Sequence, residues 1–199
     1  MEIEDLIIAA DKGEADAQFN LGEIFSNKCD FAKAAYWYQK AAEGGHMAAQ
    51  LKLGDAYCYA QGVEKDDKKA LYWYEKCAEQ GDEDAQLLVA AMYSSDCPTG
   101  IDYCKAVHWY KKCAERGDEE SQYNLGVCYE NGYGVTSDMH LAVYWYEKAA
   151  NQNYEHAMLS LGNIYYAKND WEKSKEYYLN AQKLGNKTAQ EKLKELFQC

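Results

Sequence analysis

The aromatic residues of this chain recur at a fixed spacing, which limits the possible folds more than any other feature. Trp37, Trp73, Trp109 and Trp145 lie 36 residues apart, and a degenerate fifth copy follows 32 residues later at Tyr177. A second motif precedes each of them, anchored at Leu21, Leu53, Val89, Leu125 and Leu161. Two motifs that alternate at one period indicate a repeated unit built from two elements.

Both motifs have the periodicity of an amphipathic helix. In the first, Ala49, Leu53 and Tyr57 follow one another at intervals of four residues, and in the second Ala70, Tyr74 and Ala78 do the same. Each set forms one stripe on a helical face, so a single repeat cannot bury its apolar surface alone. We therefore expect the Trp-Tyr pairs to pack in the core rather than stack on a ligand.

Turn and cap residues mark the ends of the second helix in every repeat. An Asp stands seven residues before each aromatic anchor, at Asp30, Asp66, Asp102, Asp138 and Asp170. A carboxylate there accepts hydrogen bonds from free backbone N–H groups and favours the positive end of the helix dipole. Gly45, Gly81, Gly117 and Gly185 follow the same helices, and Asn153 takes that place in the fourth repeat. These positions predict a left-handed residue at each helix end.

The full pattern resembles a known family. A-x-x-x-L-G-x-x-Y, then G-x-G-V, then D-x-x-x-A-x-x-W-Y-x-K-A-A-x-x-G is similar to the SEL-one-like repeat, a relative of the tetratricopeptide repeat, and is fullest over 118–150. The third unit departs from it, with Ala90 in place of Gly and "SSDCPTGI" in place of the loop. The resemblance implies an all-α fold, a right-handed alpha-alpha superhelix of about twelve helices.

We assign the chain as one solenoid domain over residues 1–199. An opening helix covers 1–13, five helix-pair repeats cover 14–186, and a closing helix with a polar outer face covers 187–199. A polar terminal cap is what a repeat array requires at its end.

Composition narrows the class of protein further. The formal net charge of −12 argues against nucleic-acid binding as a main role, because phosphate contacts need a basic face. No apolar run approaches the roughly 18 residues that a membrane-spanning helix needs. The opening "IEDLIIAADKGEAD" is too short and too acidic for a secretory signal, so we expect a cytoplasmic protein.

The eight cysteines do not form a regular framework. In cysteine-rich members of the family, two cysteines eight residues apart staple each repeat; here Cys77 and Cys113 are followed at that distance by Ala85 and Ser121. We therefore expect Cys77 and Cys113 to be small buried thiols, and the cysteines to be reduced.

Cys97, Cys104 and His108 form a local group that could hold zinc, and Cys97 with Cys104 could form a loop disulfide. An ordinary surface is the favoured interpretation, with no metal site and no cofactor.

The sequence is compatible with two functions. The resemblance implies a scaffold for protein–protein interaction, which binds a peptide or protein partner on the concave face and is not an enzyme. The alternative is a β-lactamase-like hydrolase, as described for the cysteine-rich relatives. The chain lacks the S-x-x-K motif and shows no other catalytic constellation.

The candidate partner-binding residues follow from the phase of the first helices. If these helices line the concave face, the inward positions include six acidic residues and no Lys or Arg. We therefore expect a partner with basic and apolar side chains, with charge steering the encounter. The oligomeric state stays open. The candidate residues are Phe19, Glu23, Leu51, Asp55, Leu87, Ala91, Tyr123, Val127, Glu130, Leu159 and Asn163.

Overall fold

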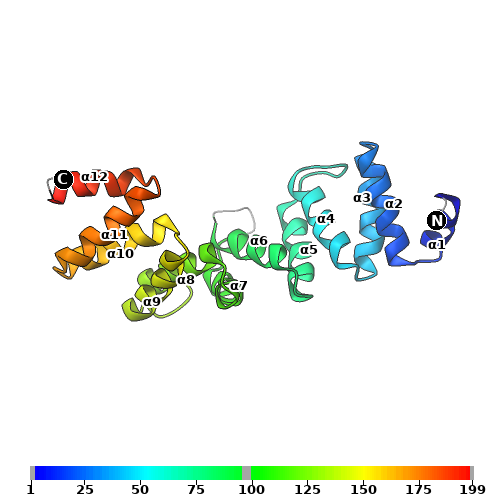
Figure 1. Cartoon of the computed structure of the whole chain (residues 1–199). Helices are drawn as coiled ribbons and strands as arrows, with labels where there is room; N and C mark the ends of the chain where they lie inside the picture. Colours follow the sequence, from blue (N-terminus) through cyan, green and yellow to red (C-terminus); the bar gives the residue numbers. More distant parts are fainter. Residues whose placement is uncertain (1–2, 96–99, 198–199) are drawn as a thin grey trace. The chain divides into compact units, whose positions relative to one another are not determined.

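The computed structural model describes residues 3–95 and 100–197, and within these ranges the protein is entirely helical (Figure 1). Twelve α-helices are present over the described residues and no strand, which confirms the predicted all-α fold. Their bounds are α1 Ile3–Asp11, α2 Ala15–Asn27, α3 Phe31–Glu43, α4 Met47–Cys58, α5 Asp67–Glu79, α6 Glu83–Ser94, α7 Tyr103–Arg116, α8 Glu119–Asn131, α9 Met139–Asn151, α10 Glu155–Ala167, α11 Trp171–Lys183 and α12 Lys187–Phe197.

The chain forms two compact units, Met1–Asp102 and Tyr103–Cys199. Unit 1 holds α1–α6 and unit 2 holds α7–α12. The even-numbered helices α2 to α10 are the first helices of the five repeats, and the odd-numbered helices α3 to α11 are the second helices. The boundary falls between the two helices of repeat three. The assignment of 1–199 to one solenoid domain stays a prediction.

Four of the five predicted caps of the second helices are confirmed, and the cap predicted at Asp102 stays a prediction. Asp30 and Asp170 each accept one backbone N–H, while Asp66 and Asp138 each accept two. The first helices carry caps that the sequence pattern did not reveal. Asp82 and Asp118 accept from the N–H three residues on, and His46 does the same through Nδ1. The predicted left-handed positions are also confirmed: Gly45, Gly81, Gly117, Asn153 and Gly185 all have positive φ.

In four of the five repeats the core tyrosine ring lies on a glycine, whereas repeat three has Ala90 at the glycine position. A Cβ atom added to Gly54 would lie 2.5 Å from the Tyr74 ring, and one added to Gly126 would lie 2.6 Å from the Tyr146 ring. Because only a bare Cα leaves this space, the Leu-Gly motif of the first helix and the Tyr of the second form one contact. Gly22 with Tyr38 and Gly162 with Tyr178 repeat it.

The tryptophans contribute less evenly than the sequence predicts. Trp109 and Trp145 are buried in unit 2, but Trp37 and Trp73 are only half-buried in unit 1. The buried ring in all five repeats is the tyrosine that follows the anchor position, so the expectation that both rings fill the core holds fully only for α7 and α9.

The G-x-G-V loops pack against the preceding repeat. A Cβ atom on Gly62 would lie 2.1 Å from the carbonyl oxygen of Phe31, and one on Gly134 would lie 2.3 Å from that of Tyr103. Both glycines also have positive φ. The backbone of the loop therefore touches the first turn of the second helix before it. In repeat three, residues 96–99 of the substituted loop lie outside the described residues.

Candidate functional site

The eleven candidate residues lie on the first helices, six in unit 1 and five in unit 2. The large apolar members are all half-buried rather than free: Phe19, Leu51, Leu87, Tyr123 and Leu159. Phe19 stacks on His46 with ring centroids 4.4 Å apart. Tyr123 lies 5.3 Å from Tyr154 and 5.6 Å from Tyr146. This row therefore packs partly against its neighbours and leaves part of each side chain at the surface.

The polar candidates share a second role that the sequence did not show. The hydroxyl of Tyr74 donates to Asp55 at 2.8 Å, that of Tyr146 to Glu130 at 2.6 Å, and Tyr38 donates to Glu23. In repeat five the acceptor is Asn163, 2.7 Å from the Tyr178 hydroxyl.

Each candidate acceptor therefore anchors the core tyrosine of its own repeat. Burial, and after it the hydrogen bond to a carboxylate, raises the pKa of Tyr74 and Tyr146 above the ordinary tyrosine value. A charge reversal at Asp55 or Glu130 would remove a hydrogen bond from the core as well as a surface charge. Asn163 shows that an amide oxygen can accept the same bond, so amide variants preserve it.

Two cavities occupy equivalent places in the two units. In unit 1 a cavity of about 70 Å³ lies between α2, α3 and α4, where Ser26, Phe31 and Asp55 line it. In unit 2 a cavity of about 340 Å³ lies between α8, α9 and α10, where Glu130, Met139 and Asn163 take the corresponding positions. Three of the eleven candidates thus line a cavity. Phe31 and Met139, each the first residue of a second helix, were not among the candidates.

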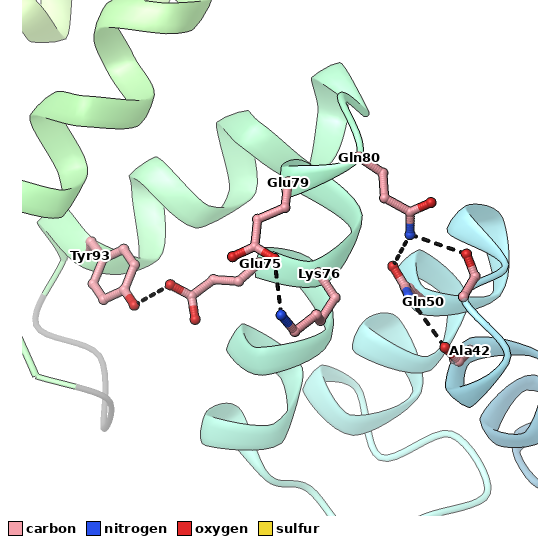
Figure 2. Close-up of polar contacts among 8 residues, drawn as sticks. Ala42, Gln50, Glu75, Lys76, Glu79, Gln80 and Tyr93 are labelled. Carbon is pink, nitrogen blue, oxygen red and sulfur yellow. Dashed lines mark hydrogen bonds and ion pairs between the residues drawn. The ribbon is translucent and has the colours of Figure 1, made fainter.

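Contacts made by the second helices of repeats two and four recur at an interval of 72 residues, and one of them involves the sequence YWYEK, which occurs at residues 72–76 and 144–148. Figure 2 shows Tyr93 donating to Glu75 of that motif, and Tyr165 donates to Glu147 in the second copy. Gln80 donates to Gln50 and to the Gly45 carbonyl, and Gln152 does the same to Gln122 and Gly117. The Glu of YWYEK is therefore a contact to the next repeat.

The cysteines within the described ranges are free thiols: Cys29, Cys58, Cys77, Cys104, Cys113 and Cys128. Burial raises the pKa of Cys77 to about 12 and that of Cys128 to about 11, so both are weak nucleophiles. Cys104 is exposed and lies 3.7 Å from the Gly134 carbonyl. Cys97, the third member of the candidate metal group and one partner of the candidate disulfide, lies outside the described residues.

None of the helices described here combines the length and apolar character needed to cross a bilayer. Over the same residues, no group of three His, Cys, Asp or Glu side chains is placed to hold a metal ion.

Comparison with known proteins identifies the repeat. Residues 15–46, 48–82, 83–118 and 119–154 each match the Sel1 repeat. The chain is 31% identical to c5321, a protective antigen of uropathogenic Escherichia coli with the SLR fold; the match covers 99% of this chain and 44% of that one, with a TM-score of 0.77. A Sel1 repeat protein from Oxalobacter formigenes is 30% identical over 94% of this chain and 57% of its own, with a TM-score of 0.82.

This chain thus spans about half the length of those two proteins. YrrB, a tetratricopeptide repeat protein, shares the fold at 19% identity and a TM-score of 0.66, over 98% of this chain and 99% of that one. Four matched repeats, similar cores in both units and two relatives at 30–31% identity agree. The chain belongs to the Sel1 repeat family.

Proposed function

We propose that this protein is a scaffold that binds a peptide or protein partner on the first-helix face of its repeats. The observation that carries the proposal is the cavity between α8, α9 and α10. It has a volume of about 340 Å³ and is lined by the apolar side chains of Met139, Ile164 and Ala167 and by the polar side chains of Glu130 and Asn163. An apolar anchor side chain beside polar groups is how peptide-binding grooves combine affinity with orientation.

Charge favours a partner that carries basic side chains next to the apolar anchor. The aligned inward positions include Glu23, Asp55 and Glu130 and contain neither Lys nor Arg. The rim is not purely acidic, because Lys52 lines the unit 1 cavity and Lys168 the unit 2 cavity. A basic partner is attracted because the three carboxylates outnumber these two lysines. Added salt is expected to weaken this attraction.

The relatives are consistent with a binding role. YrrB is described as a tetratricopeptide repeat protein with an unusual peptide-binding site, and it shares the fold of this chain. We propose that the present protein also binds peptides, without implying that its binding site is the one in YrrB. We further propose that the protein is cytoplasmic and that it has no catalytic activity.

The hydrolase alternative has no observation in its favour. Cys77 and Cys113 are buried free thiols, and Ala85 and Ser121 stand where the stapled relatives carry the second cysteine. Incubation with a chromogenic cephalosporin provides the check, and hydrolysis above background would replace the scaffold proposal with an enzymatic one.

Selection of a randomised decapeptide library on the immobilised full chain tests the scaffold proposal. We expect enrichment of sequences with a large apolar residue next to Lys or Arg. Ala167→Arg should abolish their binding, because Ala167 is exposed at the end of α10 and a long cation there would fill the cavity mouth. Glu130→Gln should weaken binding roughly tenfold at low salt, the size of one lost charge contact of about 1.4 kcal/mol.

The matched control is Asn27→Arg. Asn27 occupies the position of Ala167 in repeat one, it is also exposed, and it does not line the unit 1 cavity. Binding that survives in Ala167→Arg, or that falls equally in Asn27→Arg, would rule out the unit 2 cavity as the anchor site. Enrichment of acidic peptides would contradict the charge assignment.

A further inference from the structure

A second cavity in unit 2 lies apart from the first-helix face and contains none of the eleven candidate residues. It has a volume of about 280 Å³ and opens between α9, α10 and α11. The side chains that matter for its chemistry are Glu147 from α9, Tyr165 from α10, and Lys173, Glu176, Tyr177 and Asn180 from α11.

Two tyrosine rings form one wall of this cavity. Tyr165 and Tyr177 are stacked, with centroids 5.6 Å apart and an interplanar angle of 6°. The Tyr165 hydroxyl donates to Glu147 at 3.3 Å, which holds that carboxylate beside the rings. Burial, and then the charge of Glu147, raises the pKa of Tyr177 to about 12, so its phenol is neutral at physiological pH. The wall thus combines aromatic faces with a fixed anion.

Repeat five departs from the other repeats at this cavity. On three of the four earlier second helices an exposed tyrosine pairs with the lysine four residues later; repeat three has His108 in place of that tyrosine, and Lys112 lies over the Trp109 ring instead. Lys40 lies 5.2 Å from the Tyr36 ring, Lys76 lies 6.0 Å from Tyr72, and Lys148 lies 5.2 Å from Tyr144. Repeat five has Glu176 in place of that tyrosine and Asn180 in place of that lysine.

These two replacements change the local charge by −2, since a lysine is lost and a carboxylate is gained. Three lysines remain close to these residues, and one of them is Lys183, whose Nζ donates to Asn180 at 3.3 Å. Lys173 lies 4.9 Å and Lys168 5.7 Å from the centroid of the Tyr165 ring. Of the charged groups that line the cavity, Glu147 and Glu176 outnumber the single ammonium of Lys173. Repeat five therefore has an aromatic wall and two carboxylates at the place where earlier repeats supply their own cation.

We propose that this cavity binds an arginine side chain of a protein partner. A guanidinium is planar and weakly hydrated, so it can stack on a tyrosine ring while its N–H groups donate to carboxylates on either side. Tyr177 supplies the ring, and Glu147 and Glu176 supply the acceptors. Asn180, which also accepts a hydrogen bond from Lys183, stands at the position where the other repeats carry a lysine. The partner's arginine takes the place of the missing cation.

NMR titration of the full chain with N-acetyl-arginine amide tests this inference. We expect saturable shifts of the side-chain amide signals of Asn151 and Asn180, both of which line the cavity. N-acetyl-citrulline amide, which has the same shape without the charge, should cause no saturable shift. Asn180→Lys restores the residue of the other repeats, and Glu176→Gln removes one acceptor. Each should weaken binding of the arginine probe at least tenfold.

Glu75→Gln is the matched control, because Glu75 stands 72 residues before Glu147 and accepts the equivalent hydrogen bond from Tyr93 (Figure 2). It should leave probe binding unchanged. Equal binding by Asn180→Lys, or equal shifts with the citrulline probe, would overturn the inference. Tighter binding of free L-arginine than of the capped probe would indicate a small-molecule site instead. This test is independent of the decapeptide selection. Ala167 does not line this cavity, so Ala167→Arg can abolish binding of the decapeptides while the arginine probe still binds.

Discussion

The two units use the same backbone position to build two different cavities. In unit 1 Ser26, Asp55 and Ala56 leave about 70 Å³, whereas in unit 2 Glu130, Asn163 and Ile164 border about 340 Å³. The helices around both cavities belong to equivalent repeat positions, but their side chains differ, and the loop between the two helices is four residues longer in repeat four than in repeat one. A repeat array can thus keep its core while each junction takes a separate binding surface.

The tyrosine hydrogen bonds show how the core tolerates that variation. Asp55 and Asn163 lie two residues after their Leu anchors, but repeat four has Val127 there, and its acceptor Glu130 lies one helical turn further on. The donor stays in place while the acceptor moves. The surface of the first helices can therefore change without leaving a buried hydroxyl unpaired.

The largest expected effect concerns the unequal burial of the tryptophans. Trp109→Ala should lower the free energy of unfolding by about 3–5 kcal/mol, because the residue is only 7% exposed. Trp73→Ala, at the half-buried equivalent in unit 1, should cost about 1–3 kcal/mol. Urea denaturation followed by circular dichroism measures both. Lys111→Ala is the exposed control and should change the value by less than about 0.5 kcal/mol; equal losses for both tryptophans would show that the units pack alike.

Loop glycines should give the next largest effect. Gly134→Ala places a Cβ atom against the backbone of Tyr103 at positive φ, and we expect a loss of about 2–4 kcal/mol from clash and strain together. Gly132→Ala has similar φ but meets its nearest atom at 3.5 Å, so only the strain of about 1–2 kcal/mol applies. Thermal or urea unfolding of both variants separates the cost of the clash from the cost of the backbone strain. Equal losses would mean that the loop does not press on the preceding helix.

Removing single hydroxyl groups tests the change of acceptor between the units. Tyr74→Phe breaks a hydrogen bond to the Asp55 carboxylate and should cost about 1.5–3 kcal/mol. Tyr178→Phe breaks a bond to the Asn163 amide and should cost about 0.5–1.5 kcal/mol. Asp55→Asn, which retains an acceptor, should cost less than Tyr74→Phe. A larger loss from Tyr178→Phe than from Tyr74→Phe would contradict the ranking.

Alkaline pH should weaken the fold through the same tyrosines. Burial raises the pKa of Tyr74 and Tyr146 above the ordinary 10.0, so near that pH the unfolded chain loses phenolic protons that the folded chain keeps. Stability is therefore complete below about pH 10 and falls as the pH rises further. Unfolding measured between pH 8 and 12 should show a shallower fall for Tyr74→Phe. If the free energy of unfolding falls equally with pH in the wild type and in Tyr74→Phe, deprotonation of Tyr74 does not contribute to the loss of stability.

The sequence predicted the helices, their caps and their ends because each depends on residues close together in the chain. The spacing of the Trp residues gives the length of the repeat. Asp66 caps the beginning of α5, and Gly81 takes the left-handed conformation just after its end. The sequence did not reveal that Asp55 serves Tyr74, since that pairing depends on side chains 19 residues apart on two packed helices. The cavity of repeat five could be recognised in the sequence, because Glu176 and Asn180 stand where three of the four earlier repeats have a Tyr-Lys pair.

The smallest expected effect comes from returning Met158 to the residue of the other repeats. Gln50, Gln86 and Gln122 each donate to a carbonyl eight residues earlier, at 3.0–3.2 Å, and Met158 takes their place in repeat five. In Met158→Gln the new amide can reach the Ala150 carbonyl, and the gain of about 1 kcal/mol offsets lost apolar burial. We expect a net change within about 1 kcal/mol by urea denaturation. Gln122→Met, the reverse exchange, also loses the contact from Gln152 and should destabilise by more. If Met158→Gln proves the more damaging of the two, repeat five has diverged in its core as well as at its surface.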